Sequence, residues 1–202
     1  MKNNIKNINW DNWNPKIKAT LLFVFNQDEV LLIHKKTGLG KGKINAPGGK
    51  IEEGESPEEC AIRETFEEVC IKPSDINKGG ELFFQFVDGL TIHGHVFYTD
   101  TYSGIPKETD EAKPFWCPID EIPYENMWED DITWLPSLLS KDYFKGYYIF
   151  DDEKTLIQEF TTNVNLNLGS KFTKTSLENK LTNNDGRVNF DGTLKKSSKY
   201  KF

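Results

Sequence analysis

The chain is poor in cysteine and lacks long apolar runs. It holds three cysteines in 202 residues, and Cys60, Cys70 and Cys117 form no disulfide framework. No apolar run is long enough to span a bilayer, and no secretory signal segment stands out. These absences exclude a disulfide-stapled secreted domain and a helical membrane protein. We therefore expect a reducing compartment, the cytoplasm, or also the nucleus or mitochondrion in a eukaryote.

Charge divides the chain into an acidic body and a basic end. Residues 163–202 carry eight Lys plus Arg and three Asp plus Glu, so the tail is +5 and the remainder −12. We expect an N-terminal extension over residues 1–16, one domain over 17–162 and a poorly ordered polar tail over 163–202. A basic tail could contact nucleic acid, but it lacks interleaved aromatic residues, and the acidic body opposes stable nucleic-acid binding.

Residues 56–69 read as a helix with one apolar and one acidic side. Ser56 is a suitable N-cap, Pro57 suits the first helical position, and Glu59 can complete a capping box. An apolar stripe repeats every four residues, with a flank of two more side chains, and would pack on a sheet. The stripe is Ala61, Thr65 and Val69, and the flank is Ile62 and Phe66.

The other side of this helix carries Glu64, Glu67 and Glu68 within about a 100° arc, so their oxygens can converge on cations. Hard oxygen ligands favour Mg²⁺, with Mn²⁺ as the alternative. Zinc is disfavoured, because the three histidines show no ligand spacing with the cysteines and are better read as packed or hydrogen-bonded strand residues. They are His34, His93 and His95. An isolated run of glutamates would usually be a solvated helix face.

The full spacing around the helix resembles the Nudix box: Gly49, five residues, Glu55, seven residues, Arg63-Glu64, two residues, then Glu67-Glu68. This resemblance implies metal-dependent pyrophosphate hydrolysis, with Gly49 adding a carbonyl ligand to the three helical glutamates. Arg63 is expected to reach back to a box glutamate such as Glu55. The box normally closes with glycine where this chain has Cys70, so the helix could end less sharply or run one residue further.

Strand signals surround the helix. We expect an α/β Nudix fold with a mixed β-sheet in an α/β/α sandwich, and a second helix that has Pro136 inside it or at its start. Asp88-Gly89 is expected to join two strands in a hairpin. The glycine-rich loop 37–43 lacks Walker spacing and is read as flexible, with Lys41 and Lys43 able to attract a triphosphate. The expected strands are residues 19–25, 30–34, 81–87, 92–99, 115–117, 147–150 and 155–160, and the second helix is 132–139.

A closer resemblance covers residues 19 to about 160. The segments GHVFYTD (94–100), IDEIPYENMWEDD (119–131) and FKGYY (144–148) are similar to the oxidised purine nucleoside triphosphatases, the nucleotide-pool-sanitising branch related to MutT. By position, the resemblance implies that a base is read by one amide, one indole and two acids, in a pocket lined by three further residues. The first set is Asn45, Trp128, Asp130 and Asp131, and the second is Thr20, Lys35 and Phe84.

Without the resemblance, Asp130-Asp131 would be read as a helix N-cap and Trp128 as a core aromatic. Leu39 stands where relatives carry phenylalanine, which predicts weaker base stacking or a wider pocket.

The expected activity is Mg²⁺-dependent hydrolysis of 8-oxo-dGTP or 2-hydroxy-dATP to the monophosphate and pyrophosphate, by a monomer. Glu67 or Glu68 would help to deprotonate the water.

Two other functions stay open. Hydrolases of ADP-ribose or dinucleoside polyphosphates share the box, but they usually carry proline or tyrosine where this chain has Phe86 and Val87. A catalytically silent nucleotide-binding module is the other alternative.

Overall fold

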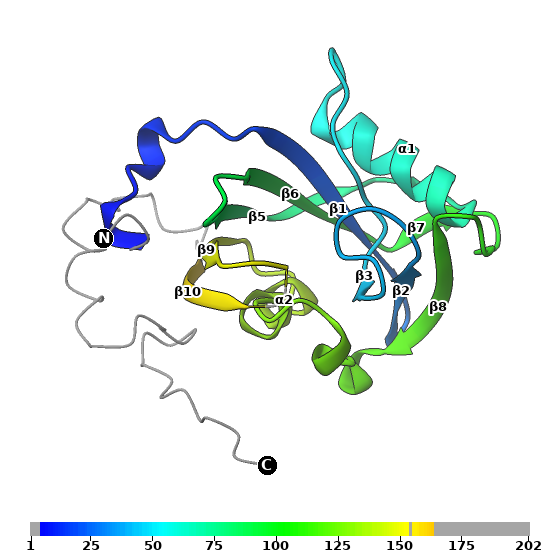
Figure 1. Cartoon of the computed structure of the whole chain (residues 1–202). Coiled ribbons are helices and arrows are strands. Elements are labelled where there is room, and N and C mark those ends of the chain that lie inside the picture. The colour runs from blue at the N-terminus through cyan, green and yellow to red at the C-terminus, as the bar shows by residue number, and fades with distance from the viewer. Residues whose placement is uncertain (1–4, 154, 164–202) are drawn as a thin grey trace.

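The structure is a computed structural model that describes residues 5–153 and 155–163, and its centre is a mixed, eight-stranded sheet (Figure 1). The strand order is β10-β9-β5-β6-β1-β2-β3, with β8 paired to β2, and β4 and β7 form a separate two-stranded sheet. Parallel pairing occurs between β1 and β6 and between β5 and β9. The strands are β1 (Ile17–Asn26), β2 (Glu29–Lys35), β3 (Ile44–Asn45), β4 (Lys72–Ser74), β5 (Asn77–Phe86), β6 (Thr91–Thr99), β7 (Thr101–Ser103), β8 (Ala112–Pro118), β9 (Phe144–Phe150) and β10 (Leu156–Asn163).

Two helices cover opposite faces of this sheet, α1 (Pro57–Val69) and α2 (Asp131–Leu139). Side chains alternate across a strand, and β1 shows the consequence. Leu22 and Val24 pack in a buried cluster with α1, whereas Phe23 and Phe25 pack in another with α2. The expected mixed sheet and α/β/α sandwich are confirmed.

Helix α1 begins as its sequence predicts. The Ser56 hydroxyl accepts a hydrogen bond from the Glu59 amide at 3.2 Å, and the Glu59 carboxylate accepts one from the Ser56 amide at 2.9 Å. The expectation for the other end is wrong: the helix ends sharply at Val69. Cys70 itself adopts the left-handed conformation, with φ of 61° and ψ of 20°, that glycine would supply.

The apolar stripe of α1 is buried as predicted, but its flank is covered only in part, because Ile62 is half-buried and Phe66 is exposed. Ala61, Thr65 and Val69 are fully buried, and the Thr65 hydroxyl donates to the Ala61 carbonyl at 2.7 Å. Phe66 is 56% exposed, so the predicted Phe66 flank is wrong. The contact with the sheet is narrower than the sequence pattern indicates.

Strand positions agree with the sequence better than strand ends. The expected Asp88-Gly89 hairpin joins β5 and β6, and Gly89 has φ of 90°. Strand β9 begins at Phe144 instead of residue 147, and β10 runs to Asn163. Pro136 lies inside α2. Short strands β3, β4 and β7 were not anticipated, because two or three residues carry no readable periodicity.

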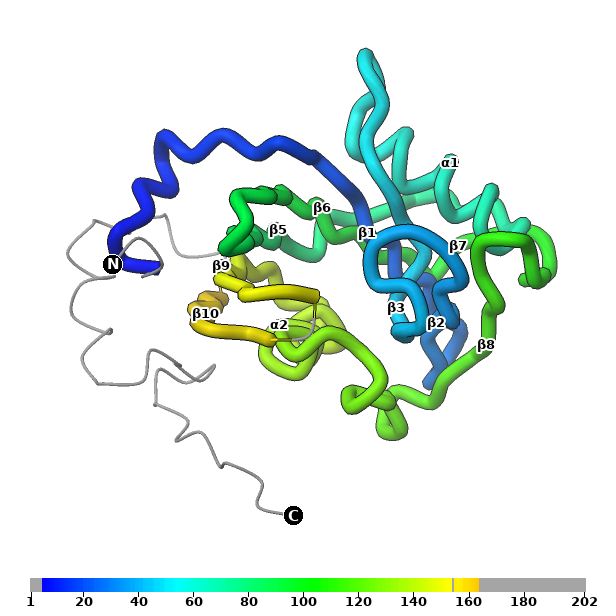
Figure 2. The backbone as a smooth tube through the Cα atoms, in the orientation of Figure 1, coloured from blue at the N-terminus to red at the C-terminus, as the bar shows by residue number. Residues whose placement is uncertain are grey.

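The N-terminal segment packs on the far end of the sheet (Figure 2). It forms two short 3-10 helices, Ile5–Asn7 and Trp10–Asn12. Ile5 is buried with Ile149 and Phe160, and the Trp10 ring lies 5.0 Å from that of Tyr147. The predicted basic tail lies outside the described residues apart from Asn163. Within the part of the chain that is described, no helix has the length and apolar character to cross a membrane.

Candidate active site

Arg63 on α1 ties the loop before the helix to the helix itself. Its Nε and Nη2 donate to the two oxygens of Glu55 at 2.8 and 2.9 Å, as the sequence predicts. Its Nη1 donates to Glu64 at 2.8 Å and to Glu67 at 2.9 Å. The Arg63 hydrogen bonds lower the pKa of Glu55 to about 2. Arg63 therefore fixes the positions of three of the box carboxylates through charge-assisted hydrogen bonds.

Glu68 is the most deeply buried of the box carboxylates. Only 1% of its side chain is exposed, and Oε1 lies 3.0 Å from Lys35 Nζ. Oε2 accepts a hydrogen bond from the Gly48 amide at 2.9 Å. Burial raises the pKa of Glu68, and the nearby Lys35 charge opposes this effect. The carboxylate thus sits at the base of the site with both oxygens engaged.

Gly49 lies directly against Glu64. A Cβ at residue 49 would overlap the Glu64 carboxylate, so any other residue at this position would have to displace that carboxylate from where Arg63 holds it. Burial raises the pKa of Glu64. The Gly49 carbonyl accepts a hydrogen bond from the Thr20 amide at 2.9 Å and, as a two-lone-pair acceptor, can take a further ligand. Glu67 is the exposed member of the set, with 51% of its side chain accessible.

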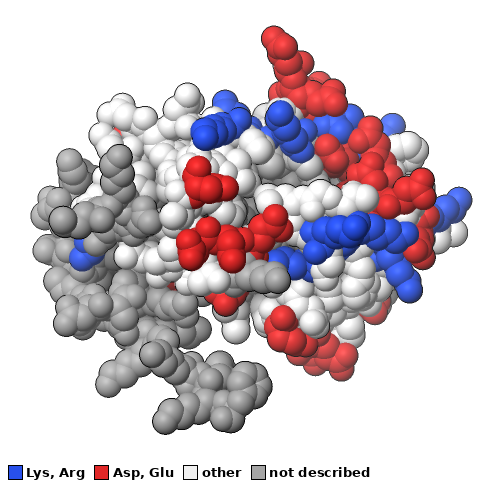
Figure 3. Space-filling model, viewed as in Figure 1, with Lys and Arg blue, Asp and Glu red and all other residues white. Residues whose placement is uncertain are grey.

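Acidic side chains gather over the side of the molecule where α1 lies (Figure 3). Glu52, Glu53, Glu59 and Glu67 are exposed there. Such a surface repels a polyanion unless cations intervene. The arrangement suits the binding of divalent ions better than the direct binding of a phosphate chain.

A cavity of about 430 Å³ connects the box glutamates with the base-reading residues that the resemblance implied. Glu64 and Glu68 lie at its wall near α1, and Asp130, Asp131 and Trp128 lie at its wall near α2. Its lining also includes predicted residues Thr20, Lys35, Asn45, Gly49 and Phe84, together with Leu39. The structure therefore brings both predicted sets, apart from Glu67, Arg63 and Glu55, to one cavity.

Asp130 and Asp131 are buried neighbours at the start of α2. Asp130 occupies the N-cap position but makes no capping hydrogen bond with its side chain. Instead Trp134 Nε1 donates to Asp130 Oδ2 at 3.0 Å, and the Trp128 amide donates to Asp131 Oδ2 at 3.1 Å. Asp130 Oδ1 is buried without a hydrogen-bond partner in the described part of the chain. Ordinary helix capping does not account for this pair.

Burial raises the pKa of both acids, and the charge of Asp131 raises the pKa of Asp130 further. Two buried acids that interact in this way favour a shared proton over two charges. The pair can then present a hydroxyl donor and a carboxylate acceptor to the same ligand.

Trp128 is half-buried, and Lys43 lies over its ring at 5.1 Å. Lys43 Nζ also donates to the Met127 carbonyl at 3.3 Å. Asn45 is half-buried and its side-chain oxygen accepts from the Ala46 amide at 2.8 Å. This contact leaves the Asn45 amide group as the donor that can face the cavity.

Two predicted pocket residues are placed differently from the rest. The Thr20 hydroxyl lies 3.4 Å from the Cys60 sulfur on the α1 side of β1, and Lys35 is paired with Glu68. Both side chains therefore contact residues of α1, not the Asp130/Asp131 pair. Phe84 lines the cavity and stacks on Tyr148 with ring centroids 5.4 Å apart.

Several lining residues were not anticipated. They are apolar side chains on the inner face of β1, β5 or β6, or on α2, and from the sequence alone each would be assigned to the core. They are Leu21, Leu82, Phe86, Ile92 and Trp134. Lys43 was read as a loop cation for a triphosphate, whereas its ammonium lies beside Trp128. Nothing in a single sequence distinguishes a core apolar residue from one that lines a cavity.

Comparison with known proteins identifies the family of this chain. The NUDIX domain model matches residues 15–138. The oxidized purine nucleoside triphosphate hydrolase of Danio rerio is 40% identical over 140 residues, which is 69% of this chain and 90% of that protein. Its counterpart in Mus musculus is 39% identical over 139 residues, or 68% of this chain and 89% of that protein.

Solved structures agree on the fold. A MutT protein from Bacillus halodurans superposes with a TM-score of 0.64 at 26% identity, covering 72% of this chain and 97% of that one. A MutT Nudix hydrolase from Burkholderia pseudomallei, at 21% identity and a TM-score of 0.54, covers 63% of this chain and 98% of its own, and shares the fold. The box geometry, the domain match and the relatives lead to one conclusion: the chain belongs to the Nudix family.

Proposed function

We propose that this protein hydrolyses oxidised purine nucleoside triphosphates, such as 8-oxo-dGTP and 2-hydroxy-dATP, to the nucleoside monophosphate and pyrophosphate. One observation carries the proposal: a single cavity has the box glutamates at one end and the buried Asp130/Asp131 pair at the other. The relatives that are about 40% identical are named as hydrolases of such nucleotides, which supports this substrate class. The removal of damaged precursors from the nucleotide pool is the consequence.

The donor set near α1 fits Mg²⁺, or Mn²⁺, because it offers carboxylates and a carbonyl and leaves room for phosphate oxygens. Glu64, Glu67, Glu68 and the Gly49 carbonyl would hold the ions, and the close approach of Gly49 to Glu64 supports this set. When bound, the ions would neutralise the charge of the phosphates and lower the pKa of a bound water.

The protein side chains would orient the reacting groups and accept the proton of the attacking water. Glu67 is our choice for the group that accepts the proton from water, because both oxygens of Glu68 are already engaged by Lys35 and Gly48. Arg63 would orient Glu67 and Glu64 through its two hydrogen bonds from Nη1. Water would attack the β-phosphorus, and the bond to the oxygen between the α- and β-phosphorus would break. Water labelled with ¹⁸O would then place the label in pyrophosphate.

Base recognition would rest on the acids and the indole. Trp128 can stack on a purine, and Asn45 can donate from its amide group. A proton exchanged within the Asp130/Asp131 pair would allow the site to match both the 8-oxo-guanine and the 2-hydroxy-adenine edge. The unpartnered Asp130 Oδ1 supports this role, because a bound base would supply the missing hydrogen bond.

We also propose that the protein acts as a cytoplasmic monomer, with its catalytic domain over residues 17–162. The three cysteines are free, which supports a reducing compartment.

The test is pyrophosphate release with Mg²⁺ across 8-oxo-dGTP, 2-hydroxy-dATP, dGTP, dATP, ADP-ribose and diadenosine tetraphosphate. A clear preference for the oxidised purines is expected. A preference for ADP-ribose or the dinucleotide would keep the box and overturn the base assignment. Absence of turnover with intact nucleotide binding would instead indicate a silent binding module. Glu67→Gln is expected to abolish turnover while nucleotide binding stays measurable.

A further inference from the structure

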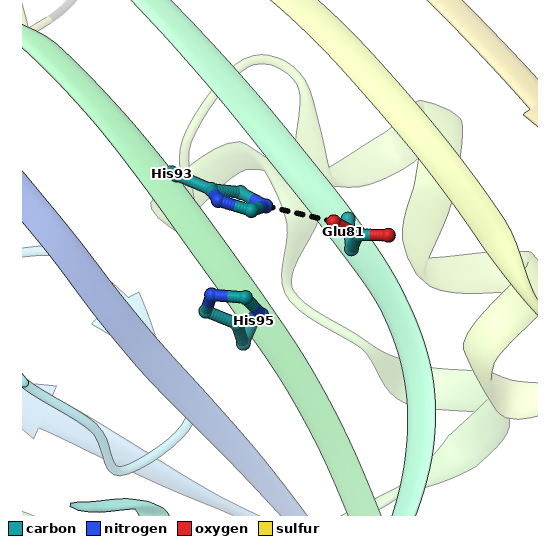
Figure 4. Close-up of side chains that lie close together, drawn as sticks. All are labelled: Glu81, His93 and His95. Atoms are coloured by element: carbon teal, nitrogen blue, oxygen red, sulfur yellow. Dashed lines mark hydrogen bonds and ion pairs between the residues drawn. The ribbon is translucent and has the colours of Figure 1, made fainter. Parts of the chain in front are cut away.

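A second group of metal-ligand side chains lies on the β5–β6 pair, on the sheet face opposite the cavity. His95 is directly opposite Glu81 in the strand register, and His93 is two residues before His95, so all three share one face. Figure 4 shows the three side chains together, with His93 directed at Glu81. The intervening residue Gly94 and the preceding Ile92 line the cavity on the other face.

We propose that Glu81, His93 and His95 form a binding site for a divalent transition-metal ion of the zinc type, separate from the carboxylate site on α1. One ligand atom from each residue lies within 4.8 Å of the other two. Tetrahedral zinc with bonds of 2.0–2.1 Å needs ligand atoms about 3.3 Å apart. The His93 Nε2 to Glu81 Oε2 distance is 2.8 Å, so two of the three ligand atoms are already close enough together to bind one ion.

The carboxylate is held in place by outer partners. The Tyr143 hydroxyl donates to Glu81 Oε1 at 2.7 Å, and Lys145 Nζ lies 2.9 Å from the same oxygen. Both partners bind Oε1, so Oε2 is the oxygen that faces the histidines. Such hydrogen bonds to a ligating carboxylate are a regular feature of metal sites.

The histidines are also restrained. Phe83 stacks on the His93 ring with centroids 4.5 Å apart, and the His93 and His95 rings lie 4.2 Å apart. These ring contacts limit the rotation of both imidazoles and keep them beside Glu81.

The chemistry of the group selects the class of ion. Two imidazoles and one carboxylate suit zinc and neighbouring transition metals, whereas Mg²⁺ and Ca²⁺ prefer oxygen ligands throughout. Lys145 offsets the charge of Glu81, which further weakens the attraction for hard cations that bind mainly through charge. The carboxylate site and this site therefore differ in the metal they select.

The expected role is structural. The ion would join β5 to β6, and the opposite face of β5 presents Leu82, Phe84 and Phe86 to the cavity. An ion that binds only the folded protein stabilises it by mass action, and so zinc is expected to raise the melting temperature. Turnover with Mg²⁺ is expected to stay unchanged when the site is removed.

The test uses the full chain with excess Mg²⁺, so that the carboxylate site is occupied, and adds Zn²⁺ for calorimetry or Co²⁺ for visible spectroscopy. His95→Gln is expected to weaken binding by more than the roughly 10–100-fold that loss of an outer partner causes. His34→Gln is the matched control, because His34 is exposed and packs beside Phe115 on a different strand pair. Equal Co²⁺ spectra for wild type and His95→Gln would overturn the proposal, as would an equal loss in His34→Gln.

Histidine side-chain NMR of the wild-type protein keeps the test independent of how well the variants fold. The chain has three histidines, so each resonance can be assigned by substitution. Zinc is expected to shift the signals of His93 and His95 and to leave that of His34 in place. Unshifted signals of His93 and His95 at saturating zinc would show that the ion binds elsewhere and would end the proposal.

Discussion

Lys35 Nζ lies 3.0 Å from Glu68 Oε1, and this ion pair joins β2 to the carboxylate at the base of the candidate metal site. The lysine is the nearest counter-charge to a carboxylate that is almost fully buried. A buried carboxylate that loses its partner charge is strongly unfavourable. A divalent ion bound beside Glu68 would supply the same compensation.

Lys35→Met should therefore destabilise the metal-free protein, and Mg²⁺ should restore part of the loss. We expect a loss of about 2–3 kcal/mol in the free energy of unfolding, because Glu68 keeps its hydrogen bond from Gly48. Urea unfolding with EDTA and then with Mg²⁺ measures both effects. Lys36→Met is the control: its partner Glu108 is exposed, so the loss should be under about 1 kcal/mol with or without Mg²⁺.

Leu39→Phe should strengthen purine binding. Leu39 lines the cavity and is 41% exposed, so a larger ring can be accommodated at its rim. An added aromatic contact of about 0.5–1.5 kcal/mol corresponds to a decrease in KM of roughly 2- to 12-fold for the preferred nucleotide. Ile105→Phe is the control, since Ile105 is 75% exposed and lies away from the cavity lining. An unchanged KM in Leu39→Phe would show that residue 39 does not contact the base.

The sequence was most informative where spacing alone fixes geometry. The Ser56/Glu59 capping box and the Arg63–Glu55 contact follow from positions along one helix and its preceding loop, and both are present. Fold class followed from the resemblance and from strand patterns. Contacts between distant strands could not be read in this way: the Lys35–Glu68 pair depends on how β2 lies beside α1.

The Glu81/His93/His95 group shows the same limit. His93 and His95 are two residues apart, which is a local pattern, but Glu81 joins them only through the β5–β6 register. A register shift of one residue would move Glu81 to the other face. The exposure of Phe66 was also not predictable, because helix periodicity gives a face and does not say how much of it the sheet covers.

Cys70→Gly should stabilise the protein. Cys70 has φ of 61°, a conformation that costs a non-glycine residue about 1–2 kcal/mol and costs glycine little. Glycine loses more backbone entropy on folding, so the net gain should be about 0.5–1 kcal/mol. Thermal or urea unfolding measures it. Cys70→Ala is the matched control, because it removes the thiol and keeps the strain, and it should give no gain; an equal gain in both variants would assign the effect to the sulfur.

Asp131 should make the stability of the protein fall as pH rises. Burial raises the pKa of Asp131 from 3.8 to about 7 in the folded state. Between these values the folded state retains a proton that the unfolded chain has released. The contribution of this residue to stability is therefore fully present below pH 3.8 and is lost as the pH rises towards 7.

Asp131→Asn tests this linkage, because asparagine has nearly the same shape, can still accept from the Trp128 amide and carries no charge at any of these pH values. The difference in unfolding free energy between the variant and wild type should grow in favour of the variant from about pH 4 to 7, by up to about 1.4 kcal/mol per pH unit. Urea unfolding at several pH values measures it, and Asp28→Asn, at an exposed turn, controls for loss of a carboxylate in general. Subtracting the unfolding free energy of wild type from that of the variant cancels the contributions of other carboxylates, such as Glu55 and Glu81. The pKa values of these two are lowered, so the stabilisation that they provide is lost as the pH falls in both proteins. A constant difference across the range would mean that Asp131 holds no proton in the folded protein between pH 4 and 7, and the proton of the pair would then lie on Asp130 throughout.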